Sequence, residues 1–238
     1  MHFSLCDLVA DIVQNCAESG ASLVELAIWE TDEPGNPEKA AAREFRFFAG
    51  DNGKGMTGAE LDRNMDPFVT DGIKHPGRRV GLGLPFLVQT AVDCGGGWMI
   101  SSTRKEEETV LRSGGSGMAG TVKEDSWYAG GSAAGTSVEA WFDLTNVDTP
   151  PVGDIPGLFR LALLFTGPGE MILKRTRKGG SASGNNGIHS GSAGKADLDY
   201  EVKKSELMET LGGNLEDVVS LVLLREYLHS LEGIDTDN

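Results

Sequence analysis

The sequence has no long apolar run and few cysteines. Its densest apolar stretch, Leu158 to Phe165, is short and contains Arg160, so it predicts a core helix rather than a membrane span. No basic and apolar signal precedes the first predicted helix. The three cysteines are odd in number and form no C-x-x-C pair, which is typical of a reducing compartment. We therefore expect a cytoplasmic chain without a membrane partner.

Positive charge is also scarce. The 238 residues contain 21 Lys and Arg against 36 Asp and Glu, which gives a formal net charge of -15. Nucleic acids and anionic membranes are polyanions, so neither is expected to be the main partner of this chain. A bound nucleotide would need a metal ion and local hydrogen-bond donors. The length suffices for one large domain, or for one domain with an extension.

The first predicted helix carries two polar residues on one side. Apolar residues recur at spacings of three and four from Leu5 to Ala17, which is the helical period. Asp11 and Asn15 are one turn apart, so they share a side of this helix. The Asn15 amide is a neutral oxygen ligand that Mg2+ accepts, and Asp11 could orient or deprotonate a water aimed at a phosphate. An isolated pair of this kind also fits an ordinary helix surface.

A second polar segment, Asp51-Asn-Gly-Lys-Gly55-Met56, follows the strand predicted from Glu44 to Ala49. Gly53 and Gly55 let the backbone approach a ligand closely. The Asp51 carboxylate can accept a hydrogen bond from an exocyclic amine, the feature that separates adenine from guanine. Because Asp-Asn-Gly is also among the commonest turn sequences, a plain tight turn is the alternative.

The third segment, Gly81-Leu-Gly83-Leu84-Pro85, opens a helix predicted to run to about Cys94. The unpaired N–H groups and the positive dipole end of a helix start attract phosphate. The sequence contains no Gly-Lys-Ser or Gly-Lys-Thr, and no G-x-G-x-x-G after a first strand, so neither a Walker loop nor a dinucleotide fold is predicted. A plain connection from loop to helix would also explain the glycines.

In this order and spacing, the segments resemble motifs of the GHKL superfamily, which comprises the ATP-binding domains of gyrase-type topoisomerases, heat-shock chaperones, sensor histidine kinases and mismatch-repair ATPases. The stretch from Asp11 to Ala21 is similar to the N box, and Asp51 to Met56 matches the D-x-G-x-G box. The run from Asp66-Pro-Phe68 to Gly81-Leu-Gly83-Leu84 is similar to the sensor-kinase pattern E-P-F-F-T-T followed by G-T-G-L-G-L. Gly135-Thr136-Ser-Val138 resembles the last G-T-x-V strand. The likeness covers about Phe3 to Leu144.

The resemblance implies a fold and a set of ligands. The fold is a two-layer α/β sandwich (α+β) of the histidine kinase-like ATPase type, and the ligands are ATP and Mg2+. Asn15 would hold the metal, and Asp51 would take the adenine amino group. The other nucleotide-binding residues would belong to the base pocket, the phosphate loop or a lid from Val69 to Val80. They are Gly53, Gly55, Met56, Lys74, Gly81, Leu82, Gly83, Leu84 and Thr136.

Two departures from the family pattern affect how the ATP is used. Where nucleotide-hydrolysing members place Glu, this chain has Asp11, which is shorter by one methylene, so hydrolysis is expected to be slow. Arg79 replaces the first glycine of G-T-G-L-G-L. It and Arg78 could reach the phosphates or be solvated, and the same alternatives hold for Lys74 in the lid.

Thr149-Pro-Pro151 is the predicted boundary between residues 1–148, the ATP-binding domain, and residues 152–238, a C-terminal α+β extension. The predicted elements of the extension are a helix from Pro156 to Phe165, a β-hairpin of Met171 to Arg177 and Asp197 to Val202 with a mobile connection at 179–194, and a helix from Asn214 to about Glu232. The last helix has a broad apolar stripe. We expect this stripe to pack on its own domain, with a homodimer as the alternative. Its members are Leu215, Val218, Val219, Val222, Leu223, Tyr227 and Leu231.

Two functions agree with these residues. The first is an ATPase or a stand-alone protein kinase that phosphorylates a partner protein, with Asp11 as the base or orienting group. It would lack its own phosphoacceptor domain, because no histidine stands in a phosphoacceptor motif and the N box begins close to Met1. The second is a non-catalytic module in which ATP orders the lid and exposes a surface of the extension to a partner protein. At the level of the sequence, both remain open.

Overall fold

The protein is represented by a computed structural model that describes residues 4–33, 42–67, 83–105, 107–116, 134–165, 169–179, 197–212, 215 and 217–234. Within these residues the strands form one seven-stranded sheet in the order β4-β3-β5-β2-β1-β6-β7. The strands are β1 (Leu23–Glu33), β2 (Ala42–Asp51), β3 (Gly97–Thr103), β4 (Val110–Gly115), β5 (Gly135–Asp143), β6 (Glu170–Gly179) and β7 (Leu198–Lys203). Only β1 and β6 pair in parallel; the other neighbours are antiparallel.

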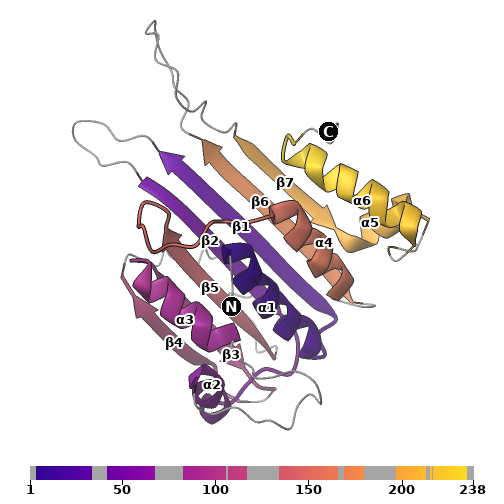
Figure 1. Ribbon diagram of the computed structural model, residues 1–238. Coiled ribbons are helices and arrows are strands. Elements are labelled where there is room, and N and C mark those ends of the chain that lie inside the picture. The colour runs from indigo at the N-terminus through magenta and orange to yellow at the C-terminus, as the bar shows by residue number, and fades with distance from the viewer. Residues whose placement is uncertain are drawn as a thin grey trace, which may run out of the picture.

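The helices form a second layer on this sheet. They are α1 (Leu5–Glu18), α2 (Gly58–Met65), α3 (Gly83–Asp93), α4 (Ile155–Phe165), α5 (Lys204–Thr210) and α6 (Val218–Leu231). Helices α1, α3 and α4 lie over one face of the sheet (Figure 1). The predicted two-layer α/β sandwich is therefore confirmed. The described helices include none that combines the length and the hydropathy of a membrane span.

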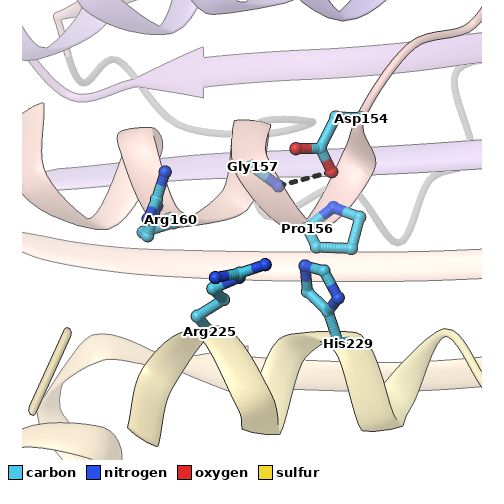
Figure 2. A pocket seen from close by; sticks show the side chains of 6 residues that line it. All are labelled: Asp154, Pro156, Gly157, Arg160, Arg225 and His229. Carbon is cyan, nitrogen blue, oxygen red and sulfur yellow. Dashed lines mark hydrogen bonds between the residues drawn. The ribbon is translucent and has the colours of Figure 1, made fainter. Parts of the chain in front are cut away.

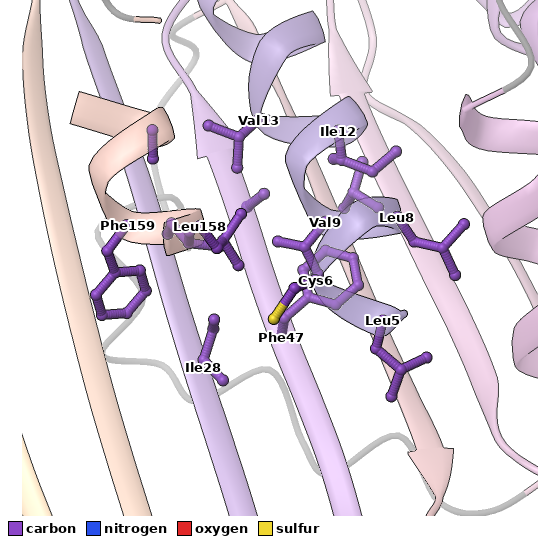
Figure 3. Close-up of a cluster of buried hydrophobic side chains, with 14 of the residues drawn as sticks. Leu5, Cys6, Leu8, Val9, Ile12, Val13, Ile28, Phe47, Leu158 and Phe159 are labelled. Atoms are coloured by element: carbon purple, nitrogen blue, oxygen red, sulfur yellow. The ribbon is translucent and has the colours of Figure 1, made fainter. Parts of the chain in front are cut away.

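Helix α1 begins at a capping box and buries one face on the sheet. Ser4 Oγ accepts a hydrogen bond from Asp7 N at 3.2 Å, and Asp7 Oδ2 accepts one from Ser4 N at 2.9 Å. Its buried side chains pack against β1, β2 and α4 (Figure 3); they are Leu5, Cys6, Leu8, Val9, Ile12, Val13 and Cys16. This packing leaves Asp11 half-buried and Asn15 exposed at the side of the helix.

In the described part of the chain, the opposite face of the sheet carries ion pairs. Lys174 Nζ lies 2.6 Å from a carboxylate oxygen of Glu25. Arg46 pairs with Glu139, and its guanidinium carbon lies 5.7 Å from the centre of the Trp29 ring. Because these side chains satisfy one another in contact with solvent, this face needs no apolar cover, which agrees with a fold of two layers.

Two adjacent strands lie where the hairpin is predicted. Strands β6 and β7 pair antiparallel with Lys174 opposite Glu201, and the two side chains form an ion pair at 3.7 Å. Strand β6 also pairs in parallel with β1, so the sheet continues from the N-terminal part of the chain into the C-terminal part. The division of the chain at Thr149-Pro-Pro151 stays a prediction. The connection at 179–194 lies outside the described residues except for Gly179, which ends β6.

Several element boundaries differ from the predictions. Strand β1 extends to Glu33, because its outer half pairs with β2 on one side and β6 on the other. The sequence predicts a strand only from Leu23 to Trp29 and a connection from Thr31 to Ala42, so the connection is shorter than predicted. Strand β4 lies in a region rich in Gly, Ser and charged residues, for which the sequence predicts no strand pairing. The alternation of side chains in β4 is weak in the sequence, and its partner β3 defines the strand.

The C-terminal helix packs by a different stripe from the predicted one. Asn214 lies outside the described residues, and α6 begins at Val218 with Asp217 as its N-cap. Its buried positions are one turn apart: Ser220, Leu224 and Leu228. Five of the seven predicted stripe residues are exposed instead: Val218, Val219, Val222, Leu223 and Tyr227. The expected packing of these five on their own domain was wrong, because the helix is apolar on more than one side and periodicity alone could not select the docking side.

A buried charge network joins β1, β6, β7 and the end of α6. The Arg175 side chain is 0% exposed. It donates hydrogen bonds to Glu30 Oε2 at 2.7 Å and to Glu232 Oε1 at 3.1 Å. Glu232 also accepts from Arg177 at 2.9 Å and from Tyr200 at 2.8 Å. Burial, together with the negative charge of Glu232, raises the pKa of Tyr200 above its ordinary value. The network attaches the last helix to the sheet.

We expect Arg175→Met to lower the free energy of unfolding by about 3–5 kcal/mol, because it removes the cation that two buried carboxylates share. Urea denaturation measures this loss. Arg43→Met is the matched control, since the pair of Arg43 with Asp32 at 3.3 Å is about half exposed and should contribute less than about 1 kcal/mol. Equal losses in the two variants would contradict the structural role of the network.

Candidate nucleotide-binding site

The carboxylate of Asp51 is held at the junction of α1 and β2. Asp51 is the last residue of β2 and is 2% exposed. Its Oδ1 accepts hydrogen bonds from Gly53 N at 2.8 Å and from Ser19 Oγ at 2.9 Å. Burial raises the pKa of Asp51, and hydrogen bonds from Gly53, Ser19, Cys16 and the Thr136 backbone oppose that rise. The carboxylate is thus fixed in position by donors from three separate segments.

The two glycines after Asp51 are required by close backbone approaches. A Cβ at Gly53 would lie 1.9 Å from Ser19 Oγ. Gly55 has φ 65°, and a Cβ there would lie 1.9 Å from the Thr103 carbonyl oxygen. The bond from Gly53 N to Asp51 Oδ1 is itself an Asx turn. The turn that was the alternative to a ligand site is therefore present, and it places the Asp51 carboxylate.

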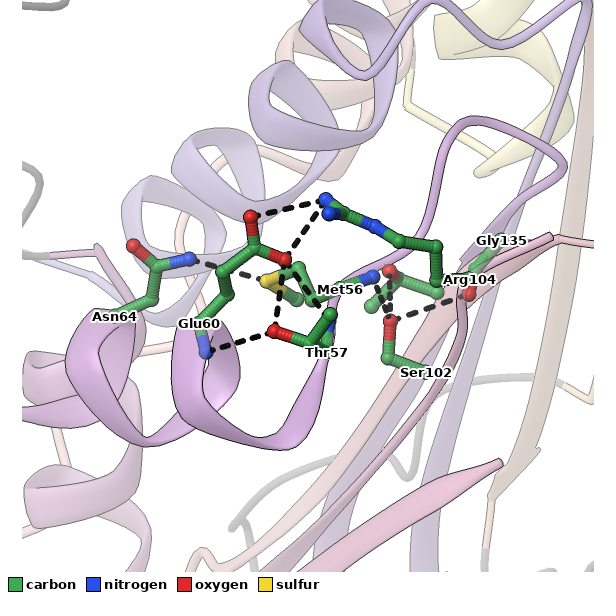
Figure 4. A network of polar contacts seen from close by, with 8 residues as sticks. Met56, Thr57, Glu60, Asn64, Ser102, Arg104 and Gly135 are labelled. Carbon is green, nitrogen blue, oxygen red and sulfur yellow. Dashed lines mark hydrogen bonds and ion pairs between the residues drawn. The ribbon is translucent and has the colours of Figure 1, made fainter. Parts of the chain in front are cut away.

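Strand register brings Thr136 next to Asp51, and Ser102 links Thr136 to Met56. Thr136 on β5 is the Cα partner of Asp51 on β2 and of Ser102 on β3. Ser102 Oγ lies 2.8 Å from Thr136 Oγ1 and accepts a hydrogen bond from Met56 N at 2.8 Å (Figure 4). Asn64 Nδ2 in turn donates to Met56 Sδ at 3.1 Å. Asp51, Met56 and Thr136, which were predicted to surround the base, are thus gathered by the sheet.

Helix α2 is held beside this end of the sheet. It begins at a capping box, with Glu60 N donating to Thr57 Oγ1 at 3.3 Å and Thr57 N donating to Glu60 Oε2 at 2.9 Å. Glu60 also pairs with Arg104, which follows β3, at 2.8 Å. Figure 4 shows these contacts next to Met56 and Ser102. Met56 and Glu60 therefore tie the start of α2 to β3 and to the residue that follows it.

The start of α3 faces the polar side of α1. Gly83 is the first residue of α3, and a Cβ there would lie 3.3 Å from Asp11 Cβ and 3.6 Å from Asn15 Nδ2. Leu84 is half-buried beside it. The backbone N–H groups of Gly83 and Leu84 are therefore next to the carboxylate and the amide predicted to serve the phosphates and the metal. Lys74, Gly81, Leu82 and the lid from Val69 to Val80 lie outside the described residues.

The donors beside Gly83 fit Mg2+ that is shared with a nucleotide. Asp11 and Asn15 supply oxygen atoms, which hard cations prefer. Among the described residues, no group of three or more His, Cys, Asp or Glu side chains could hold a metal by itself. Mg2+ is commonly bound by one or two protein oxygens together with waters and substrate phosphates, so the small donor set agrees with this mode of binding.

Two residues of the site were missed from the sequence. Ser19 lies two turns beyond Asp11 and one turn beyond Asn15, so the helical spacing that joined the first two also includes it. Ser102 occupies an inward position of β3, where the alternation from Trp98 through Ile100 predicts an apolar side chain. A serine that interrupts a buried apolar alternation is the signal that could have identified it.

Comparisons with known proteins give distant similarities. No protein-family model and no curated protein matches the sequence. The chain is similar to the ATPase domain of Aquifex aeolicus MutL complexed with ADP, with 16% identity and a TM-score of 0.41, over 74% of this chain and 61% of that chain. It is also similar to the ATP-binding domain of Francisella tularensis topoisomerase IV in complex with a small-molecule inhibitor, with 15% identity and a TM-score of 0.38, over 75% of this chain and 84% of that chain. Sequence identities and TM-scores this low do not identify a binding site. The assignment of the site therefore depends on the residues of this chain.

We expect Asp51→Asn to weaken Mg-ATP binding by about 10-fold or more, since a hydrogen bond to a charged group is worth about 1.5–3 kcal/mol. The preference for ATP over GTP should shrink at the same time, because Asp51 is the group that would read the amine. Titration calorimetry with both nucleotides measures this. Asp62→Asn, which removes an exposed carboxylate paired with Arg112, should change neither value. Unchanged ATP affinity in Asp51→Asn would show that the base does not bind here.

We expect Ser102→Ala to lower the free energy of unfolding by about 1–3 kcal/mol, because the Met56 N–H loses its acceptor in a partly buried place. Ser101→Ala, on the other side of the same strand, should change it by less than about 0.5 kcal/mol. Thermal or urea denaturation of the two variants provides the comparison. If both alanine variants were equally stable, Ser102 would not be what holds Met56 to the sheet.

Proposed function

We propose that the chain binds Mg-ATP between α1, the ends of β2 and β5, and the start of α3. The observation that carries this proposal is the arrangement along one side of α1. Ser19 contacts Asp51 at one end, and Asp11 lies against Gly83 at the other. Ser19 follows Asp11 by eight positions, which corresponds to a helical rise of about 12 Å. This span is on the scale of an extended nucleoside triphosphate, with the base at Asp51 and the phosphates at Gly83.

Each predicted residue has a place in this proposal. Asp51 accepts a hydrogen bond from the adenine amine, and Thr136 lies beside it in the sheet. Met56 lines the base pocket, where Gly53 and Gly55 allow the backbone to come close. At the other end the N–H groups of the α3 start bind phosphate oxygens, with Leu84 beside them. Lys74, Gly81 and Leu82 remain part of the proposed phosphate site and lid.

Asn15 is the proposed protein ligand of Mg2+, which when bound neutralises phosphate charge and polarises the terminal phosphoryl group. Asn15 is exposed at the side of α1 and can offer its amide oxygen without leaving the helix. Asp11 is half-buried one turn earlier and beside Gly83, where its carboxylate can orient or deprotonate an attacking water or hydroxyl. The chain would therefore act as an ATPase or as a protein kinase with a partner protein as substrate.

The surface of α6 favours a second candidate function, an ATP-gated interaction module. Val218 and Val219 are 76% and 67% exposed, and Val222, Leu223 and Tyr227 continue this apolar face. An exposed apolar face of this kind marks a surface for a protein partner, with a second copy of the chain as the alternative.

All three cysteines are buried and free of disulfides, which supports a reducing compartment such as the cytoplasm.

We expect Asp11→Asn to lower the rate of ATP turnover by about 100-fold or more, because a positioned base contributes at least that factor. Mg-ATP affinity should change little, since the predicted metal and base contacts are intact. Glu18→Gln, on the same helix but away from α3, is the control. Turnover that Asp11→Asn leaves unchanged would remove Asp11 from the proposed chemistry. Binding of Mg-ATP without turnover in the wild type would favour the interaction module.

A further inference from the structure

A second polar cavity lies between α4 and α6, away from the site described above. Its volume is about 270 Å³. Helix α4 and the residues before it contribute one wall, and α6 contributes the other (Figure 2). Arg225 and His229, one turn apart on α6, project towards α4. The lining residues are Asp154, Pro156, Gly157, Arg160, Arg225 and His229.

Two arginines line this cavity, and neither is paired with a carboxylate of the described residues. The guanidinium groups of Arg160 and Arg225 form no ion pair or hydrogen bond with any other residue that the structure describes. This is unusual in a chain with a net charge of -15. Six other arginines form ion pairs with carboxylates: Arg43, Arg46, Arg104, Arg112, Arg175 and Arg177. Arg160 and Arg225, which no described carboxylate pairs with, thus line the same cavity.

The donors of the cavity match a phosphoryl group. Each guanidinium presents a planar fork of N–H groups that suits phosphate oxygens. The His229 ring offers at least one N–H in either protonation state. Three donor side chains correspond to the three oxygens and double negative charge of a phosphate monoester, whereas a single carboxylate would need only one arginine. The volume is close to the lower end of small-ligand sites, so few atoms besides the phosphoryl group would be enclosed.

Asp154 limits how strongly an anion can bind. Its Oδ1 accepts a hydrogen bond from Gly157 N at 2.9 Å and so caps the start of α4. It is the only acidic residue among those lining the cavity, and its charge opposes that of an anion. Asparagine is an equally good N-cap, so the charge of Asp154 can be removed while the cap is kept.

We propose that this cavity binds the phosphoryl dianion of a phosphate monoester, with Arg160 and Arg225 as its charged ligands and His229 as a third donor. The monoester is either a small free molecule or a phosphorylated side chain of a protein, because both present the same group. None of these residues belongs to the proposed Mg-ATP site, so this inference stands or fails independently of that function.

The test is calorimetric titration of the whole chain with phenyl phosphate at constant ionic strength, with and without saturating Mg-ATP. We expect saturable binding of one phenyl phosphate per chain that Mg-ATP does not compete away. Arg160→Gln and Arg225→Gln should each weaken it by about 10-fold or more. Arg225→Lys should weaken it less, and Asp154→Asn should strengthen it. Lys105→Gln, which removes one exposed positive charge beyond β3, should have no effect.

Two further arms distinguish the source of the phosphoryl group. A phosphoserine peptide that binds much more tightly than phenyl phosphate indicates a protein source, and equal affinities indicate a small molecule. The unphosphorylated peptide should not bind. The proposal is overturned if the wild type shows no saturable binding of either probe at millimolar concentration, or if both arginine-to-glutamine variants bind as the wild type does. Complete competition by Mg-ATP would also overturn it, because the phosphate would then occupy the nucleotide site.

Discussion

The hydrogen bond from the Ser19 hydroxyl to the Asp51 carboxylate joins the end of α1 to the end of β2. The candidate site depends on this junction. Helix α1 is held on the sheet by its buried apolar face, so its rotation is determined and its polar side must face α3. The same rotation brings Ser19 to Asp51 and Asp11 to Gly83. One helix orientation therefore sets both ends of the proposed nucleotide site.

The sequence signals for this part of the molecule are local. Helical spacing placed Asp11 and Asn15 on one side of α1, and the glycines marked the close approaches at Gly53 and the start of α3. Ser102 can be noticed locally as a break in the apolar alternation of β3, but its contact with Thr136 could not be predicted in this way. The contact depends on which residue of β5 lies opposite Ser102, and strand register is determined by pairing between segments far apart in the chain.

The C-terminal part was less predictable for the same physical reason. The hairpin of β6 and β7 follows from alternation and opposite charges, but its position in the sheet follows from parallel pairing of β6 with β1. Arg175 faces inward on β6 and is matched by Glu30 and Glu232, residues that are distant in sequence. Among the described residues, six arginines pair with carboxylates, which makes Arg160 and Arg225, unmatched there, informative in a chain with an excess of acidic residues.

A crystal structure of the chain with Mg2+ and a non-hydrolysable ATP analogue tests the central claim most directly. The account predicts the adenine amine on Asp51, the metal on the Asn15 amide, and the phosphates at the helix start that begins with Gly83. A nucleotide bound elsewhere, including in the cavity between α4 and α6, would contradict it. So would a base held at Asp51 with its phosphates directed away from α3.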